Sequence, residues 1–174
     1  MPTEVEADRV PYVFNQQPED TDRLWKLLID VVRPQASAVL IDGYPSPDWD
    51  DFSRLPESAQ SAHEIFRELA WMQERKAGSY INLDLDPRDE SQWVALREFG
   101  SHSINVEVWA EDEEDQILIN HDSGGLWARL SVAERRTLTV KGNQAGIPID
   151  EIIEVWHPRP SLWKRLWHRT KERS

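Results

Sequence analysis

The chain has 174 residues and no cysteine, which excludes a disulfide framework and a site that holds a metal through thiolates. Only 39% of the residues are apolar, but nine Trp, four Phe and three Tyr supply enough large side chains to indicate a folded core rather than a disordered chain. The formal net charge of −12 disfavours contact with phosphate groups, so we expect the main domain to bind no nucleic acid.

The predicted secondary structure follows the spacing of apolar residues and the breaks between them. In chain order we predict a short edge strand (10–14), a helix that begins after Asp20 and ends at Pro34, a buried strand (38–41), a helix (57–76), a strand (80–86), a short helix (88–99), three strands (103–110, 116–121 and 126–130), a helix that begins at Ser131, and a short helix or last strand (149–156). Helices come early and strands gather in the middle, which favours the α+β class.

Two details of these patterns bear on how the sheet is built. One predicted strand alternates Ile81, Leu83 and Leu85 with polar residues, which predicts that these three side chains face inward. Gly124-Gly125 supplies a tight turn between two later strands, and short connections of this kind favour an antiparallel meander. We therefore expect a single α+β domain with a four- or five-stranded, largely antiparallel sheet. A mixed sheet is the alternative, and the helices are expected to pack on one face.

Charge is distributed unevenly along the chain. Residues 1–156 contain 14 Lys and Arg against 31 Asp and Glu, a formal charge of −17, whereas residues 157–174 contain six against one, a formal charge of +5. These two values add up to the −12 of the whole chain. The sequence therefore divides into a polar N-terminal segment (1–19), an acidic α+β domain (20–156) and a basic tail with two Trp residues (157–174).

The tail is expected to form a short basic helix with one apolar side. Its contact residues would be Trp163, Lys164, Arg165, Trp167 and Arg169, with Leu162 and Leu166 beside the two Trp residues. A helix of two turns is marginal alone, so the favoured expectation is that the tail docks on the acidic body. Contact with a partner and contact with an anionic membrane surface are the alternatives.

Two acidic segments occupy positions where loops are expected. The first consists of Asp48, Trp49, Asp50 and Asp51, and the second of Glu111, Asp112, Glu113, Glu114 and Asp115. Carboxylates on exposed loops keep a protein soluble, which is the plainer interpretation. They also steer and select a basic partner, and a Trp among them would anchor it. Both segments are therefore candidate partner-binding surfaces.

Motifs for chemistry are weak in this sequence. Asp84 and Asp86 lie on one strand face and Asp42 ends another strand, an arrangement that can hold Mg²⁺. The sequence contains neither the frame of a calcium loop nor an H-E-x-x-H motif nor a glycine-rich phosphate loop, so no cofactor is expected. His121 is expected to be buried with the isoleucines of its strand.

These observations favour binding over catalysis. We expect an acidic, non-enzymatic cytoplasmic protein that occludes a basic protein partner, in the manner of an inhibitor or a toxin-neutralising immunity protein, by analogy of charge and size. A metal-assisted hydrolase that uses clustered Asp residues is the alternative, and a peripheral membrane adaptor anchored by the tail is the third hypothesis. The cytoplasmic expectation rests on an acidic N-terminus without a signal peptide and on the lack of an apolar run of about 20 residues.

Overall fold

The computed structural model describes residues 9–15, 18–43, 52–73, 80–110, 116–121 and 125–157. The strands of these residues are β1 (Val10–Phe14), β2 (Ala38–Gly43), β3 (Tyr80–Leu85), β4 (Asn105–Trp109), β5 (Gln116–His121), β6 (Gly125–Leu130) and β7 (Ile153–Val155). The α-helices are α1 (Thr21–Val32), α2 (Glu57–Met72), α3 (Glu90–Phe99), α4 (Val132–Gln144) and α5 (Ile149–Ile152). Short 3-10 turns lie at η1 (Pro18–Asp20), η2 (Arg33–Gln35), η3 (Phe52–Arg54) and η4 (Gly100–His102).

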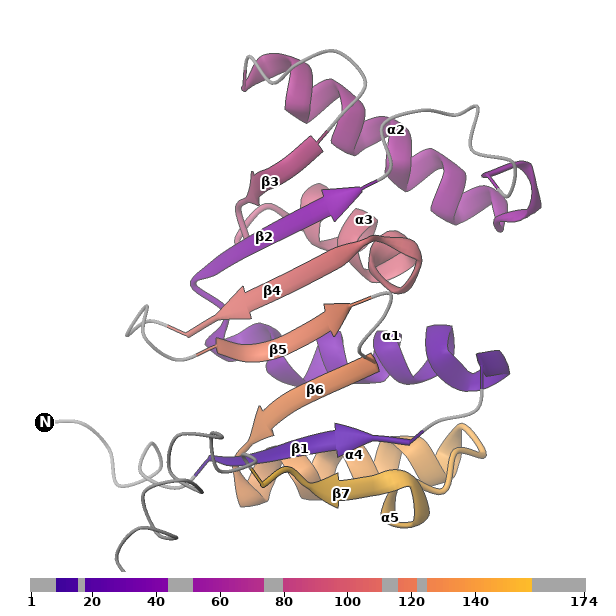
Figure 1. Cartoon of the computed structure of the whole chain (residues 1–174), viewed down its shortest axis with the longest axis vertical. Coiled ribbons are helices and arrows are strands. Elements are labelled where there is room, and N and C mark those ends of the chain that lie inside the picture. Colours follow the sequence, from indigo (N-terminus) through magenta and orange to yellow (C-terminus); the bar gives the residue numbers. More distant parts are fainter. Residues whose placement is uncertain are drawn as a thin grey trace, which may run out of the picture.

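All seven strands join one antiparallel sheet in the order β3-β2-β4-β5-β6-β1-β7 (Figure 1). The α+β class and the meander of β4, β5 and β6 are thus confirmed, whereas the expected number of four or five strands is wrong. β1 was predicted as an edge strand, but it pairs with β6 on one side and with β7 on the other. Apolar spacing predicts strands one at a time, and it does not reveal which distant strands pair. The predicted basic C-terminal helix lies outside the described residues.

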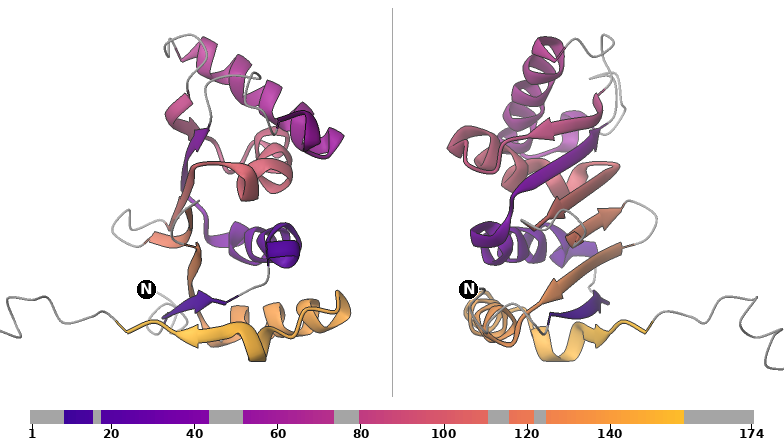
Figure 2. Two further views of the ribbon diagram at one scale, coloured as in Figure 1. Left: turned by 45° about the vertical axis from the view of Figure 1, so that its right-hand side comes forward. Right: turned by 90° about the vertical axis from the view of Figure 1, so that its left-hand side faces the viewer.

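The helices α1, α2, α3 and α4 all lie on the same face of the sheet, as the sequence predicts (Figure 2). The helices α1 and α4 cover the half of the sheet that contains β5, β6 and β1, and α2 and α3 cover the half that contains β3 and β2 (Figures 1 and 2). Because antiparallel sheets can leave one face to solvent, this arrangement divides the molecule into a helical side and an open side.

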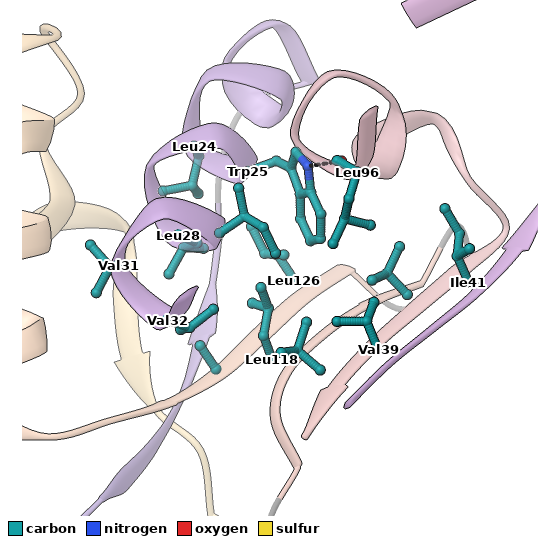
Figure 3. Close-up of a cluster of buried hydrophobic side chains, with 14 of the residues drawn as sticks. Leu24, Trp25, Leu28, Val31, Val32, Val39, Ile41, Leu96, Leu118 and Leu126 are labelled. Carbon is teal, nitrogen blue, oxygen red and sulfur yellow. Dashed lines mark hydrogen bonds between the residues drawn. The ribbon is translucent and has the colours of Figure 1, made fainter. Parts of the chain in front are cut away.

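Trp25 on α1 is the largest of the fully buried side chains that the structure describes. Its indole N–H donates a hydrogen bond of 3.1 Å to the carbonyl of Leu96 on α3, which ties the two helices together above the sheet (Figure 3). The indole also explains the glycine at position 100, because a Cβ there would lie 2.3 Å from Cζ2 of Trp25. The close contact between α1 and the end of α3 therefore requires that glycine.

β3 departs from the predicted alternation. Leu83 and Leu85 are buried, but Ile81 is 57% exposed, so the prediction for Ile81 is wrong. The reason is a backbone irregularity: Asn82 has a φ of 51°, and the pairing of β2 with β3 shifts register between Ile41 and Gly43. A residue in the left-handed region breaks the two-residue period of a strand.

The start of α4 follows the sequence prediction closely. The hydroxyl of Ser131 accepts a hydrogen bond from the amide of Glu134, and the Glu134 carboxylate accepts one of 2.8 Å from the amide of Ser131. This reciprocal pair is the capping box that the S-x-x-E spacing indicates, and it satisfies two amides at the end of the helix.

Candidate interaction surface

The face of the sheet opposite the helices, here called the open face, is the principal candidate for a functional surface. Figure 1 looks onto this face, with α1 and α4 behind the strands. Strand register places one residue from each strand in a continuous row across it. From β3 to β7 this central row is Asp84, Leu40, Glu107, Ile119, Trp127, Val13 and Glu154.

The middle of the central row is apolar. Ile119, Trp127 and Val13 are adjacent on β5, β6 and β1, and each is half-buried rather than covered. Trp156, just after β7, extends this strip: it is 42% exposed, and its ring packs edge-on against Trp127 at 6.5 Å between ring centroids. Its amide donates a hydrogen bond to the carbonyl of Pro11, which fixes the backbone at this position. Two Trp rings therefore stand together on a face that none of the described helices covers.

The carboxylates of the open face differ from those of the helical side. On the helical side, many acidic side chains are held in ion pairs, namely Asp20 with Arg23, Asp22 and Glu98 with Lys26, Asp30 and Glu98 with Arg97, Glu90 with Arg33, Glu134 with Arg9, and Asp150 with Arg135, although the exposed Glu64 and Glu68 of α2 are not among them. On the open face, Asp42, Glu107 and Glu154 form no ion pair with any residue that the structure describes.

Glu107 shows how such a carboxylate is held without a cation. It accepts hydrogen bonds of 3.1 Å from the side-chain amide of Asn105 and 2.7 Å from that of Gln116. Neutral amides fix its position but leave its negative charge uncompensated. An opposite charge stabilises a half-buried carboxylate more strongly than one fully in water. A cation placed beside Glu107 from outside the sheet would therefore be bound favourably.

Two of the three Asp residues that the sequence suggests for a metal site accept hydrogen bonds from backbone amides. The Asp42 carboxylate accepts a hydrogen bond of 2.5 Å from the backbone amide of Asn82, and the Asp86 carboxylate accepts one of 2.9 Å from the amide of Arg88 in the turn after β3. Asp84 lies between them on the open face. Among the described residues, no group of three or more His, Cys, Asp or Glu side chains is placed so that it could hold a metal ion.

If Asp42 acts by holding the irregular backbone of β3, its oxygen matters and its charge does not. Asp42→Ala should then lower the free energy of unfolding by about 1 kcal/mol, whereas Asp42→Asn, which keeps a carbonyl oxygen, should lower it by less than half as much. Urea unfolding of the three proteins measures both effects. Equal losses of unfolding free energy in the two variants would show that the negative charge of Asp42, rather than its oxygen alone, stabilises β3.

The segments predicted to contact a partner lie outside the described residues: Asp48, Trp49, Asp50 and Asp51, then Glu111, Asp112, Glu113, Glu114 and Asp115, and in the tail Trp163, Lys164, Arg165, Trp167 and Arg169. Strand direction still fixes where each is attached. β2 ends beside the start of β4, since Asp42 pairs with Asn105, so the two acidic segments are attached at opposite ends of the strands. The tail begins at the same end as the segment at 111–115.

Sequence reasoning missed the residues that make up the open face. In the sequence, Trp127 and Trp156 count only among the large aromatics that indicate a folded core, and no motif marks Glu107. A signal was present, because Val106 and Val108 alternate with Glu107, and Leu126 and Ala128 alternate with Trp127. Alternation assigns one set to the core and the other to the opposite face. What it cannot supply is the order of strands, which brings these residues into one row.

The histidines are arranged differently from the prediction. His121 is exposed rather than buried, because it ends β5 on the open face opposite Gly125, which has no side chain to cover it. His102 is largely buried on the helical side, and burial lowers its pKa, although nearby Asp22 opposes this. Its Nε2 lies 3.8 Å from Oδ1 of Asp22, while the hydroxyl of Ser101 donates a hydrogen bond of 2.9 Å to the same oxygen. A nucleophilic triad needs the imidazole between hydroxyl and carboxylate, so this cluster is not one.

Within the described part of the chain, none of the helices has the length and apolar character needed to cross a membrane. Comparison of the chain with protein-family models, with curated proteins and with solved structures finds no match.

Proposed function

We propose that the chain is a non-enzymatic binding protein that occludes a basic protein partner, as an inhibitor or an immunity-type protein does, and that the open face is the surface it uses. The observation that carries this proposal is the contrast between the two sides of the molecule. Most acidic side chains of α1, α3 and α4 are paired with Lys or Arg, whereas Asp42, Glu107 and Glu154 form no ion pair with a described residue and share the open face with two partly exposed Trp rings.

The open face has the two ingredients that protein interfaces require. Trp127 and Trp156 are large, partly exposed aromatics, the residue type that most often carries binding energy at the centre of an interface. The carboxylates around them would attract a basic partner and disfavour an acidic one. Because the surface belongs to hydrogen-bonded strands, its side chains are already in place before binding, which lowers the entropic cost of association.

The test compares two variants of equal net charge in a pull-down from native lysate. Glu107→Gln with Glu154→Gln removes two charges from the open face, and Glu64→Gln with Glu68→Gln removes two from exposed positions of α2 on the helical side. We expect wild type and the α2 variant to capture the same basic protein at low salt and to release it at high salt. The open-face variant should bind it at least tenfold more weakly, about 1.4 kcal/mol.

Glutamine at 107 keeps one oxygen to accept a hydrogen bond from Asn105 or Gln116, and its NH2 group can donate to the other residue once that side-chain amide turns its own oxygen inward, so the substitution removes the charge and keeps the side chain's size and shape. Equal capture by both variants would exclude the open face as the binding surface. Capture that survives high salt in wild type would contradict the electrostatic part of the proposal.

A further inference from the structure

The folded body of the chain ends on the open face. Trp156 is paired to β1 through its hydrogen bond to Pro11 and lies against Trp127, so the last described residues already carry an aromatic side chain onto this surface. Pro158 follows two residues later and lacks the amide hydrogen that would continue the pairing with β1. The tail therefore leaves the sheet at the border of the apolar strip.

The tail is long enough to return across this strip. The four residues at 158–161 span at most about 14 Å, and a helix over 162–169 would add about 12 Å. Strands are spaced by about 4.8 Å, which places β6, β5 and β4 at about 10, 14 and 19 Å from β7. The apolar side of such a helix, with Trp163 and Trp167, can thus lie over Trp127 and Ile119.

Charge favours the same position. The tail has a formal charge of +5, and the open face presents Glu107 and Glu154 without a cation among the described residues. The segment at 111–115, with five acidic residues, is attached at the end of the sheet where the tail begins. Among the described residues of α1, α3 and α4, most carboxylates are already paired with Lys or Arg, which leaves fewer of them to attract the tail.

We infer that the tail, residues 157–174, docks on the open face of its own chain over β6, β5 and β4, and that it covers the surface a basic partner would use. The docking of the tail is independent of the proposed function; only the statement that the tail covers the partner's surface rests on it. A tethered segment has a local concentration in the millimolar range, so even a weak contact would keep the face covered until a tighter ligand displaces the tail. The tail is thus an internal competitor of the partner.

The test uses a spin label on the full-length protein. The chain has no cysteine, so Thr170→Cys gives a single attachment site, and paramagnetic broadening is read by NMR. We expect stronger broadening of the Ile119 methyl and the Trp127 indole signals than of the Ile29 methyl, which is buried on α1 on the other side of the sheet. The effect should fall at high salt and in Glu107→Gln with Glu154→Gln, and persist in Glu64→Gln with Glu68→Gln. Stronger broadening on the helical side, or none on the open face, would overturn the inference.

A mixed sample separates docking within one chain from docking between two copies. Spin-labelled protein without isotopes is mixed with isotope-labelled protein that lacks the cysteine. Broadening of Ile119 in this sample would assign the tail to a second copy and overturn docking within the chain. An unchanged spectrum of the mixed sample, together with broadening when the spin label and the isotopes are in the same chain, would support docking within the chain.

Capture of the partner distinguishes failure of this inference from failure of the proposed function. The tail variant Trp163→Ser with Trp167→Ser should lose the broadening and bind the basic partner at least threefold more tightly. If capture depends on the open face but no broadening occurs, the docking inference fails and the proposed function stands. If broadening occurs but the open-face variant captures the partner as well as wild type does, the proposed function fails and docking stands.

Discussion

Replacement of Trp25 by alanine is expected to lower the free energy of unfolding by about 3–5 kcal/mol. The side chain has no exposed surface, so its removal leaves a cavity between α1, α3 and the sheet and deprives the Leu96 carbonyl of its indole donor. Domains of ordinary size have about 5–15 kcal/mol of stability, so a loss of this size removes a large fraction. Urea unfolding of wild type and variant at pH 7 measures the difference in midpoint and slope.

The chain provides a matched control in Trp71, which is 75% exposed near the end of α2. Trp71→Ala deletes the same atoms from a position with little packing, and its effect should stay within about 0.5 kcal/mol. Trp25→Phe should fall between the two, because it keeps a ring but loses the hydrogen bond to Leu96. Equal losses in Trp71→Ala and Trp25→Ala would contradict the assignment of Trp25 to the centre of the core.

The local parts of this fold could be predicted from the sequence because their causes are local. Ser131 and Glu134 are three residues apart, and their spacing alone indicates where α4 begins. Trp25 lies on the apolar stripe of α1 and is buried as that stripe requires. Asn82 has no such signal: its left-handed backbone depends on the pairing of β3 with β2, and this pairing exposes Ile81.

The candidate surface illustrates the same limit at a larger scale. Alternation can assign Trp127 and Trp156 each to one face of a strand. Their contact, however, exists only because β1 lies between β6 and β7. Likewise, Glu107 becomes distinctive only when its partners are known to be two neutral amides. Composition predicted an acidic protein, and it did not predict which carboxylates are paired with Lys or Arg and which share a face with partly exposed Trp rings.

The stability of the fold should fall as the pH is lowered from 6.5 towards 4, and His63 is the main reason. This residue of α2 is 2% exposed and lies between the rings of Phe52 and Phe99, at 4.9 and 5.3 Å between centroids. Burial, assisted by the positive charge of Arg67, lowers its pKa from 6.5 to about 4. His102, whose ring is 6.3 Å from that of Phe99, has a pKa lowered by burial in the same direction.

The sign follows from which state binds the proton. Below pH 6.5 the unfolded chain protonates His63, whereas the folded chain resists protonation until the pH approaches 4. The stability is therefore fully present above 6.5 and is lost as the pH falls through this window, by on the order of 3 kcal/mol for His63. A hydrogen bond from Arg33 lowers the pKa of Glu90 below its usual 4.5. Burial raises the pKa of Glu98, but hydrogen bonds from Lys26 and Ser58 outweigh it, so this pKa is also lowered. Protonation of these carboxylates therefore lowers the stability of the fold further at lower pH.

Urea unfolding at pH 7, 6 and 5 isolates the histidine contribution, since the carboxylates stay ionised across most of that range. His63→Phe keeps a ring between Phe52 and Phe99 but cannot titrate, so the loss of stability between pH 7 and 5 should be clearly smaller than in wild type. A wild-type slope retained in His63→Phe would mean that His63 is not the group that resists protonation, and the pH dependence would then be assigned to His102.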